Sequence, residues 1–94
     1  MKAEPIHEYA ITPHGVFEMA RRGLPEDLLR WVLEHPEQRY LGRPGREVVQ
    51  AKVTMGAPPK LYLVRVFLDV DRSPPEVVTA YRTSKIEKYW REEP

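Results

Sequence analysis

The chain has 94 residues, with 15 Lys and Arg against 14 Asp and Glu, a formal net charge of +1 at pH 7, and no cysteine. This length fits one small domain with a single core. The balanced charge gives no whole-molecule attraction to nucleic acid or membrane, so a polyanion site requires local clustering of cations. The missing cysteines exclude disulfides, thiolate nucleophiles and Cys-based zinc sites. We predict a single domain over residues 1–94.

No segment has the character of a membrane span or a signal peptide. The N-terminus MKAEPIHEYA contains no continuous apolar stretch. No apolar run elsewhere approaches the ~18 residues that are needed to cross a membrane. We therefore expect a cytoplasmic protein without a membrane partner.

A short strand over residues 9–11 and a first helix open the predicted fold. Thr12 is placed to cap a helix whose first residue is Pro13, where the missing N–H costs nothing. The helix is expected to run to Arg22, and Gly23 suits the left-handed position that follows it. The predicted apolar stripe is Val16, Phe17, Ala20 and Leu24, with an i,i+4 pair of Glu18 and Arg22 on the other side.

A second helix and a run of strands follow. The helix is predicted to open at Pro25, with acidic residues in its first turn, and to end at Pro36. From Gln38 onward the apolar period changes from 3.6 to 2, and turn signals separate the segments. Strands are expected from Gln38 onward and over 47–54, 60–70 and 77–82, paired mainly antiparallel through short turns. The predicted class is α+β, with two N-terminal helices packed on one face of a four-stranded, mainly antiparallel sheet.

The C-terminal residues predict a short helix. Ser84 and Glu87 have the spacing of a capping box, in which each side chain satisfies the other's backbone donor. The apolar residues of this helix share one side and are expected to pack on the domain, with the lysines outward. The packed residues are Ile86, Tyr89 and Trp90, and the outward ones are Lys85 and Lys88.

Three cations interrupt strands that are otherwise apolar or β-branched: Lys52, Arg65 and Arg82. A charge inside a strand must reach water or a partner. We therefore predict that the three line the sheet face left open by the helices, where together they hold a phosphate. Solvated positions and surface ion pairs explain any single one of them more simply. Serine-nucleophile, phosphate-loop and metalloprotease motifs are missing from the sequence.

Two further residues are candidates for proton transfer. His14, at the start of the first helix, is free to act near neutral pH, although a surface or capping role explains it more simply. Tyr81 suits stacking on an unpaired base or proton transfer, and core packing is an equal alternative. Asp69 and Asp71 are better explained by a turn at a strand end than by a bound cation, and the histidines are too scattered for zinc. We predict no metal and no cofactor.

The chain resembles domain of unknown function family 4258, which is grouped with the RelE and ParE toxins. The likeness lies in the order TPHGVFEMARRGLPEDLLRWVLEHPE, then a G-R turn with a basic strand, then VVTAYRTSKIEKY. It extends from Tyr9 to Tyr89. Its most specific pieces are Thr12 with His14, Met19 with Arg22, His35–Pro36 and Thr79–Ala80–Tyr81.

The resemblance implies a RelE-like fold and, for many relatives, metal-independent RNA cleavage. In that chemistry the ribose 2′-hydroxyl attacks the neighbouring phosphate, and the protein supplies cations, an acid and a base. The resemblance implies that His14 is base or acid, that Arg65 and Arg82 stabilise the phosphate, and that Tyr81 stacks or moves a proton. The expected substrate-binding residues are Lys52, Lys85 and Thr79.

The resemblance also implies partners, namely RNA and an antitoxin protein that holds a toxin-like endoribonuclease inactive. Two alternatives stay open. One is a non-catalytic module of the same fold that binds protein or nucleic acid, and the other is a homodimer or scaffold formed through exposed strand edges. The near-neutral charge and the lack of a basic C-terminal patch speak against a ribosomal target.

Overall fold

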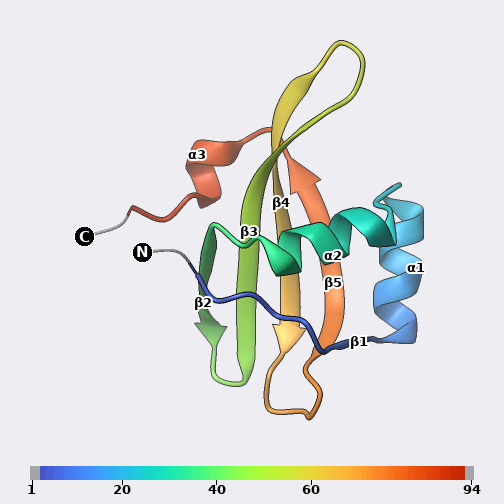
Figure 1. Cartoon of the computed structure of the whole chain (residues 1–94), viewed down its shortest axis with the longest axis vertical. Helices are drawn as coiled ribbons and strands as arrows, with labels where there is room; N and C mark the ends of the chain where they lie inside the picture. The colour runs from blue at the N-terminus through green and yellow to red at the C-terminus, as the bar shows by residue number, and fades with distance from the viewer. Residues whose placement is uncertain (1–2, 93–94) are drawn as a thin grey trace.

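A mixed five-stranded sheet forms the centre of the computed structural model, which describes residues 3–92. The strand order is β1-β5-β4-β3-β2, and three helices accompany the sheet (Figure 1). The elements are β1 (Ala10–Ile11), α1 (Pro13–Arg21), α2 (Glu26–Glu34), β2 (Gln38–Arg43), β3 (Arg46–Met55), β4 (Lys60–Asp69), β5 (Glu76–Thr83) and α3 (Ile86–Tyr89). The predicted α+β class is confirmed. Strand β1 pairs parallel to β5, and the other neighbours pair antiparallel.

The sheet has five strands rather than the four predicted. The additional strand is β1, which was predicted as a short strand over residues 9–11 but was not counted in the four-stranded sheet. Its Ala10 N–H donates to the Pro75 carbonyl at 2.9 Å, and the Thr12 N–H donates to the Val77 carbonyl at 3.0 Å. These bonds satisfy backbone groups in the extended approach to α1. The segment therefore lengthens the sheet by one parallel strand.

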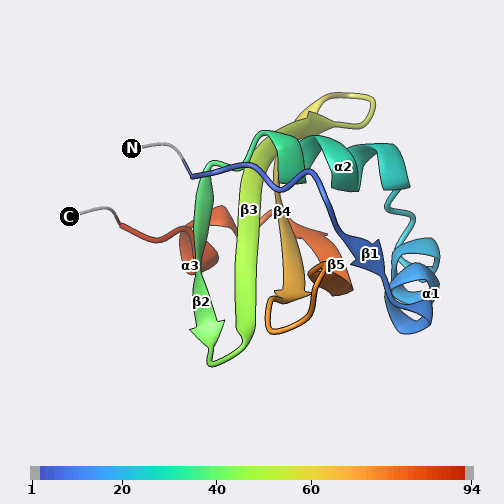
Figure 2. The same cartoon turned by 60° about the horizontal axis from the view of Figure 1, so that its bottom comes forward.

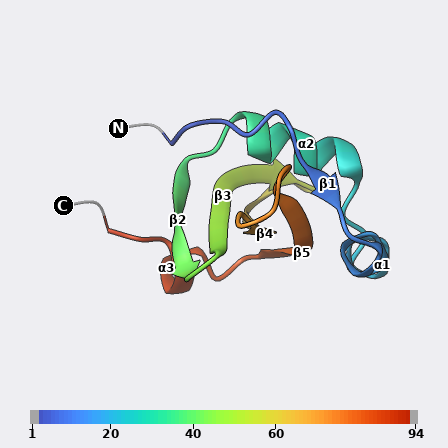
Figure 3. The same ribbon diagram turned by 90° about the horizontal axis from the view of Figure 1, so that it is seen from below.

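Helices lie on both faces of the sheet and beside one edge (Figure 3). Helix α2 covers one face, α3 lies on the other, and α1 stands next to the β5 edge. The prediction that two N-terminal helices share one face is therefore wrong for α1. The N-terminal segment, blue in Figure 2, crosses the face that α2 covers, and its Ile6 N–H donates to the Leu33 carbonyl at 2.8 Å.

The core lies between α2 and the sheet. Alternation along β4 places Val64, Val66 and Leu68 on the covered face, and all three are 0% exposed. They meet Leu29, Val32 and Leu33 of α2 in one apolar cluster. Each such side chain contributes about 1.5–3 kcal/mol when it is fully buried. The same alternation places Leu63, Arg65 and Phe67 on the opposite face, where the candidate site is found.

Helix α1 has its predicted boundaries and the opposite orientation to the one predicted. Thr12 Oγ1 accepts from the Gly15 N–H at 2.9 Å, which confirms the cap, and Gly23 has φ +65° after the helix. The predicted apolar stripe is wrong for Val16, which is 47% exposed, for Phe17, which is 62% exposed, and for Ala20. It is confirmed for Leu24, which is buried in the core. The residues buried against β5 are Gly15, Glu18 and Met19.

Gly15 lets α1 approach the backbone of β5 closely. A Cβ at this position would lie 2.8 Å from the Val77 carbonyl oxygen and 3.1 Å from Ile11 Cγ2. We expect Gly15→Ala to lower the free energy of unfolding by about 1–3 kcal/mol, because the clash outweighs the helix propensity of about 1 kcal/mol that alanine adds. Urea unfolding measures this. Ala20→Gly on the exposed side of α1 calibrates the propensity, and a stabilised Gly15→Ala protein would contradict the close packing.

The terminal helix forms without the predicted capping box. Its N-cap residue is Lys85, and no side chain caps it. The Lys85 N–H instead donates to Thr83 Oγ1 at 3.0 Å, so the chain turns one residue later than the box requires. Glu87 therefore falls too early in the helix to reach back to Ser84. The predicted direction of the helix is confirmed, since Lys85 and Lys88 are exposed while Ile86, Tyr89 and Trp90 are partly buried.

Within the part of the chain that the structure describes, no helix combines the length and the apolar character needed to span a bilayer.

Candidate anion-binding site

Arg65 lies at the centre of the sheet face opposite α2 and is 8% exposed. Its guanidinium donates three hydrogen bonds to neutral oxygens. Nε donates to Gln50 Oε1 at 2.9 Å, Nη1 to the Tyr81 hydroxyl at 2.7 Å, and Nη2 to the Tyr40 hydroxyl at 2.6 Å. Among residues 3–92 no carboxylate forms an ion pair with it. A nearly buried cation is thus held by dipoles alone.

Aromatic rings complete the surroundings of the Arg65 guanidinium. Its Cζ lies 4.4 Å from the ring centroid of Tyr89, 5.2 Å from that of Phe67 and 5.8 Å from that of Tyr81. The negative faces of such rings attract a cation without neutralising it. A buried charge is costly unless a partner compensates it. The position therefore keeps a net positive charge that favours an anionic ligand.

The C-terminal segment covers Arg65 through polar contacts. The Gln50 Nε2 donates to the Tyr89 carbonyl at 3.1 Å and to Gln38 Oε1 at 2.7 Å. The Gln38 side-chain amide in turn donates through Nε2 to the Arg91 carbonyl at 2.6 Å and accepts at Oε1 from the Arg91 N–H at 3.0 Å. No residue of α3 is fully buried. Because Tyr89 lies over the guanidinium, a ligand as large as a phosphodiester reaches Arg65 only when this ring moves aside.

Tyr89 is an ionisable group beside the buried cation. The positive charge of Lys88 is the largest influence on its phenol and lowers the pKa, and burial opposes this. Hydrogen bonds with Lys88 and Tyr81 and the charge of Arg65 lower the pKa further. The phenolate is therefore favoured relative to an ordinary tyrosine. The sequence favoured packing over base stacking for Tyr89, so its place over Arg65 is an addition to the predicted site.

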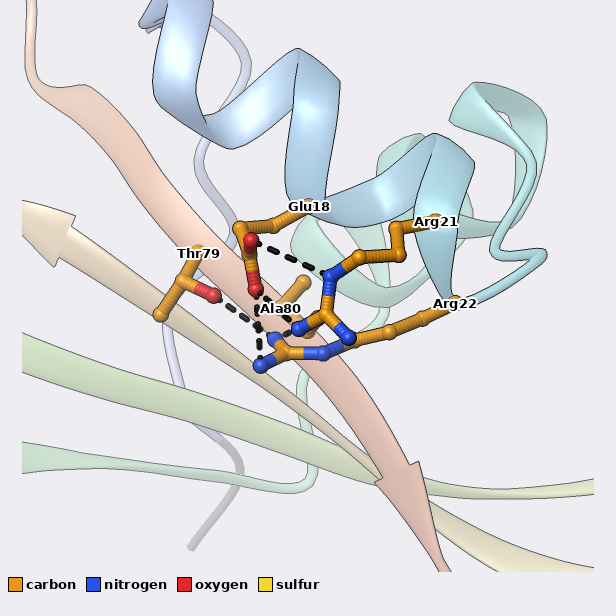
Figure 4. A network of polar contacts seen from close by, with 5 residues as sticks. All are labelled: Glu18, Arg21, Arg22, Thr79 and Ala80. Carbon is orange, nitrogen blue, oxygen red and sulfur yellow. Dashed lines mark hydrogen bonds and ion pairs between the residues drawn. The ribbon is translucent and has the colours of Figure 1, made fainter.

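A second cationic centre links α1 to β5 (Figure 4). The Arg22 Nη1 donates to Thr79 Oγ1 at 2.9 Å and to the Ala80 carbonyl at 3.0 Å, and its Nη2 lies 2.9 Å from Glu18 Oε1. Arg21 Nη2 also donates to Glu18 Oε1, at 2.8 Å. The predicted Glu18–Arg22 pair is confirmed, but it faces β5 and not solvent. This network fixes α1 against the sheet edge.

The carboxylate in this network is strongly bound. The hydrogen bond from Arg21 is the main cause that lowers the pKa of Glu18, and burial opposes it. The charges of Arg21, Arg22 and His14 lower the pKa further. The same hydrogen bond raises the pKa of Arg21. Glu18 is therefore ionised at neutral pH, which makes it a poor general base and a good orienting group for Arg22.

Tyr81 connects the two cationic centres. Its ring centroid lies 5.9 Å from Arg22 Cζ and 5.8 Å from Arg65 Cζ, and its hydroxyl accepts from Arg65. Its ring stacks on Phe67 at a centroid distance of 5.9 Å. His14 is exposed one helical turn before Glu18. Both guanidiniums thus lie against the same phenol ring, and His14 belongs to α1, the helix whose C-cap residue is Arg22.

The structure brings two of the three predicted strand cations to one face. Lys52 and Arg65 share the face opposite α2, as the β3–β4 register shows. Arg82 pairs with Val64, so its side chain lies on the α2 face, and the prediction that it joins the other two is wrong. Its Nη1 lies 3.9 Å from Met55 Sδ, and its Cζ is 5.2 Å from the Tyr62 ring centroid.

The predicted substrate-binding residues are dispersed. Lys52 Nζ lies 3.9 Å from the Trp90 ring centroid, so this ring already holds its ammonium group. Thr79 belongs to the Arg22 network through its hydroxyl. Lys85 is exposed at the start of α3. Of the three, Thr79 contacts Arg22 of the second cationic centre, and Lys52 shares the sheet face of Arg65.

Sequence reasoning missed Gln50, Tyr40, Glu18 and Arg22 as members of this face. A glutamine inside an apolar strand was a usable signal, since a buried amide needs partners. Glu18 and Arg22 were recognised as a pair and assigned to solvent. The predicted turn at a strand end is confirmed, because Asp69 is the last residue of β4 and Asp71 lies in the bend that follows. Asp69 Oδ1 also forms an ion pair with Arg46 Nε at 2.8 Å.

Among the described residues, no group of three or more His, Asp or Glu side chains is arranged to hold a metal ion. No family model, no curated protein and no solved structure matches this chain.

Proposed function

We propose that this chain is a toxin-like, metal-independent endoribonuclease with a RelE-like fold, related to domain of unknown function family 4258. The observation that carries the proposal is Arg65, a nearly buried guanidinium without a carboxylate partner among residues 3–92, bonded to phenols of which Tyr81 also lies against Arg22. A site of this kind attracts a phosphodiester and strengthens its hold as negative charge develops. RNA is the proposed substrate, and an antitoxin protein is the proposed inhibitor.

The proposed chemistry is transfer of the phosphate to the ribose 2′-hydroxyl. Arg65 and Arg22 stabilise the charge on the phosphate oxygens. His14 accepts the 2′-hydroxyl proton, and Tyr81 donates a proton to the departing 5′-oxygen. Lys52 and Lys85 guide the RNA backbone toward the face. Arg82 takes no part, because its side chain lies on the opposite face of the sheet.

A second candidate is a module that binds RNA or protein without cleaving it. This candidate is favoured because the Tyr89 ring lies over the Arg65 guanidinium and leaves Arg65 8% exposed. A binding module needs only the cationic face, whereas a nuclease also needs the proton-transfer groups to reach the same phosphate. The two candidates therefore differ in the role of His14.

Cleavage of a short labelled RNA in the presence of EDTA separates the two candidates. We expect His14→Ala to lower the cleavage rate about 100-fold or more with little change in RNA affinity, because general acid–base groups contribute roughly 10²–10⁴-fold. Arg82→Ala is the matched control for the cationic strands and should keep wild-type cleavage. If the wild-type chain binds the RNA without cutting it, the binding module is correct and the nuclease is not. If His14→Ala and Arg82→Ala lose cleavage equally, the assignment of the site to this face of the sheet is wrong.

A further inference from the structure

A hollow of about 670 Å³ lies at the C-terminal end of α2, apart from the cationic face. Its walls include Trp31, His35 and Trp90, and its rim carries Glu34 and Glu37. Pro5 and Pro36 extend the wall on either side. The chain contains two tryptophans, so both of them border this one hollow. Neither the proposed phosphate site nor the proposed chemistry uses it.

The aromatic wall is rigid and accessible. The rings of Trp31 and His35 stack with centroids 4.7 Å apart and planes 25° from parallel. His35 Nδ1 is 3.0 Å from the Trp31 carbonyl, which fixes the imidazole in this stack. Trp31 is nevertheless 45% exposed, an unusual cost for so large an apolar side chain on a small protein. At the other wall Trp90 already binds the Lys52 ammonium at 3.9 Å, so this ring is suited to a cation.

The electrostatics of the hollow are negative. Glu34 is exposed and has no hydrogen bond or ion pair within residues 3–92, and Glu37 uses Oε1 alone, to accept from the Lys52 N–H at 2.6 Å. The hollow also lies at the C-terminus of α2, where the backbone carbonyls carry partial negative charge. The last turn of this helix contains no basic residue to offset that charge. The Lys52 ammonium at Trp90 offsets part of this negative charge, whereas Glu34 and the end of α2 keep theirs.

These charges decide between the two ligands that an aromatic wall attracts. A nucleobase stacks on tryptophan, but its phosphates would face two carboxylates and a helix C-terminus. A guanidinium or ammonium group gains from the rings, the carboxylates and the helix end together. We propose that this hollow binds an arginine side chain of a partner protein. The prolines and Trp90 supply additional wall for the residues that flank the arginine.

Tryptophan fluorescence tests the proposal directly on the full chain. A capped arginine amide should give a saturable change in emission with a dissociation constant on the order of millimolar. The capped amide of citrulline, which has the same shape without the charge, should give none. A glycine-flanked arginine peptide should bind more tightly than the capped amino acid. Glu34→Gln should weaken binding about two- to fivefold, and Trp31→Phe should weaken it and remove most of the signal.

Glu26→Gln, at the other end of α2, is the control for a change in net charge and should bind as the wild type does. Equal binding of citrulline, or equal effects of Glu34→Gln and Glu26→Gln, would overturn the assignment of a cation. A peptide that binds no better than the capped amino acid would overturn the assignment to a protein partner. Saturation by adenosine monophosphate in place of arginine would identify a nucleotide site and refute the proposal. Circular dichroism of each variant confirms that the fold persists.

Discussion

Arg65→Lys is expected to lower RNA binding and cleavage by about 100-fold while the protein stays folded. Lysine keeps the positive charge, but its ammonium cannot satisfy the Gln50, Tyr81 and Tyr40 oxygens in the planar arrangement that the guanidinium uses. It also cannot hold a phosphate through two parallel hydrogen bonds. Loss of one well-placed donor typically costs 10²–10³-fold in rate. Filter binding and single-turnover cleavage of the same RNA measure the two effects.

A second variant separates the charge from the packing. Arg65→Met retains much of the apolar stem and removes every donor, which leaves the buried Gln50 Oε1 without its partner. We expect this change to lower the free energy of unfolding by about 1–3 kcal/mol, the cost of an unpaired buried polar group. Arg43→Lys, at an exposed position of β2, is the control and should change neither quantity. If Arg65→Met bound RNA as tightly as the wild type, Arg65 would be a structural cation only.

Local signals predicted the boundaries of the elements well. Thr12 and Pro13 start a helix because the cap and the fixed φ act on neighbouring residues, whatever the tertiary structure. Gly23 ends the helix region for an equally local reason, since it adopts φ +65°. The alternation along residues 60–70 likewise predicts the buried face of β4 from single-strand geometry. Interactions within a few residues were thus readable from the sequence.

Contacts between secondary-structure elements were harder to predict from the sequence. The buried side of α1 depends on where that helix meets β5, and the close approach at Gly15 overrides the apolar pattern of Val16 and Phe17. The partner of Arg65 is Gln50, which only the β3–β4 register brings opposite to it. Neither fact is contained in the pattern of one element.

One error in the predicted site was avoidable. Tyr81 and Arg82 are adjacent in a strand, and adjacent strand residues point to opposite faces of the sheet. A site that contains both side chains on one face therefore conflicts with the strand assignment itself. The β4–β5 register resolves the choice, because Tyr81 lies opposite Arg65 and Arg82 lies opposite Val64.

Glu18→Gln is expected to destabilise the protein at neutral pH and to have little effect in acid. The ordinary pKa of Glu18 is 4.5, and the native environment lowers it, chiefly through the Arg21 hydrogen bond. A carboxyl with a lowered folded pKa contributes stability that is fully present above its unfolded pKa. That contribution is lost as the pH falls through the folded pKa. The melting temperatures of the wild type and the variant should therefore differ at pH 7 and converge at pH values below the folded pKa of Glu18.

The control is Glu8→Gln, an exposed carboxyl without a hydrogen bond or ion pair among the described residues. It removes the same charge, and its melting temperature should differ little from that of the wild type at every pH. If the difference in melting temperature between Glu18→Gln and the wild type persisted unchanged to the acid end of the pH series, shape and not charge would make Glu18 important. Thermal melts at matched ionic strength provide the comparison.

The same variant also tests the role of Arg22 on the cationic face. Glu18 Oε1 lies 2.9 Å from Arg22 Nη2 and therefore competes with any phosphate for this guanidinium. Neutralising the carboxylate should weaken the anchoring of α1 and at the same time strengthen RNA binding. A structural role for Arg22 alone predicts the loss of stability and no gain in affinity. Opposite signs of the two effects would identify Arg22 as a ligand of the phosphate if Glu8→Gln, which removes the same charge, leaves RNA affinity unchanged.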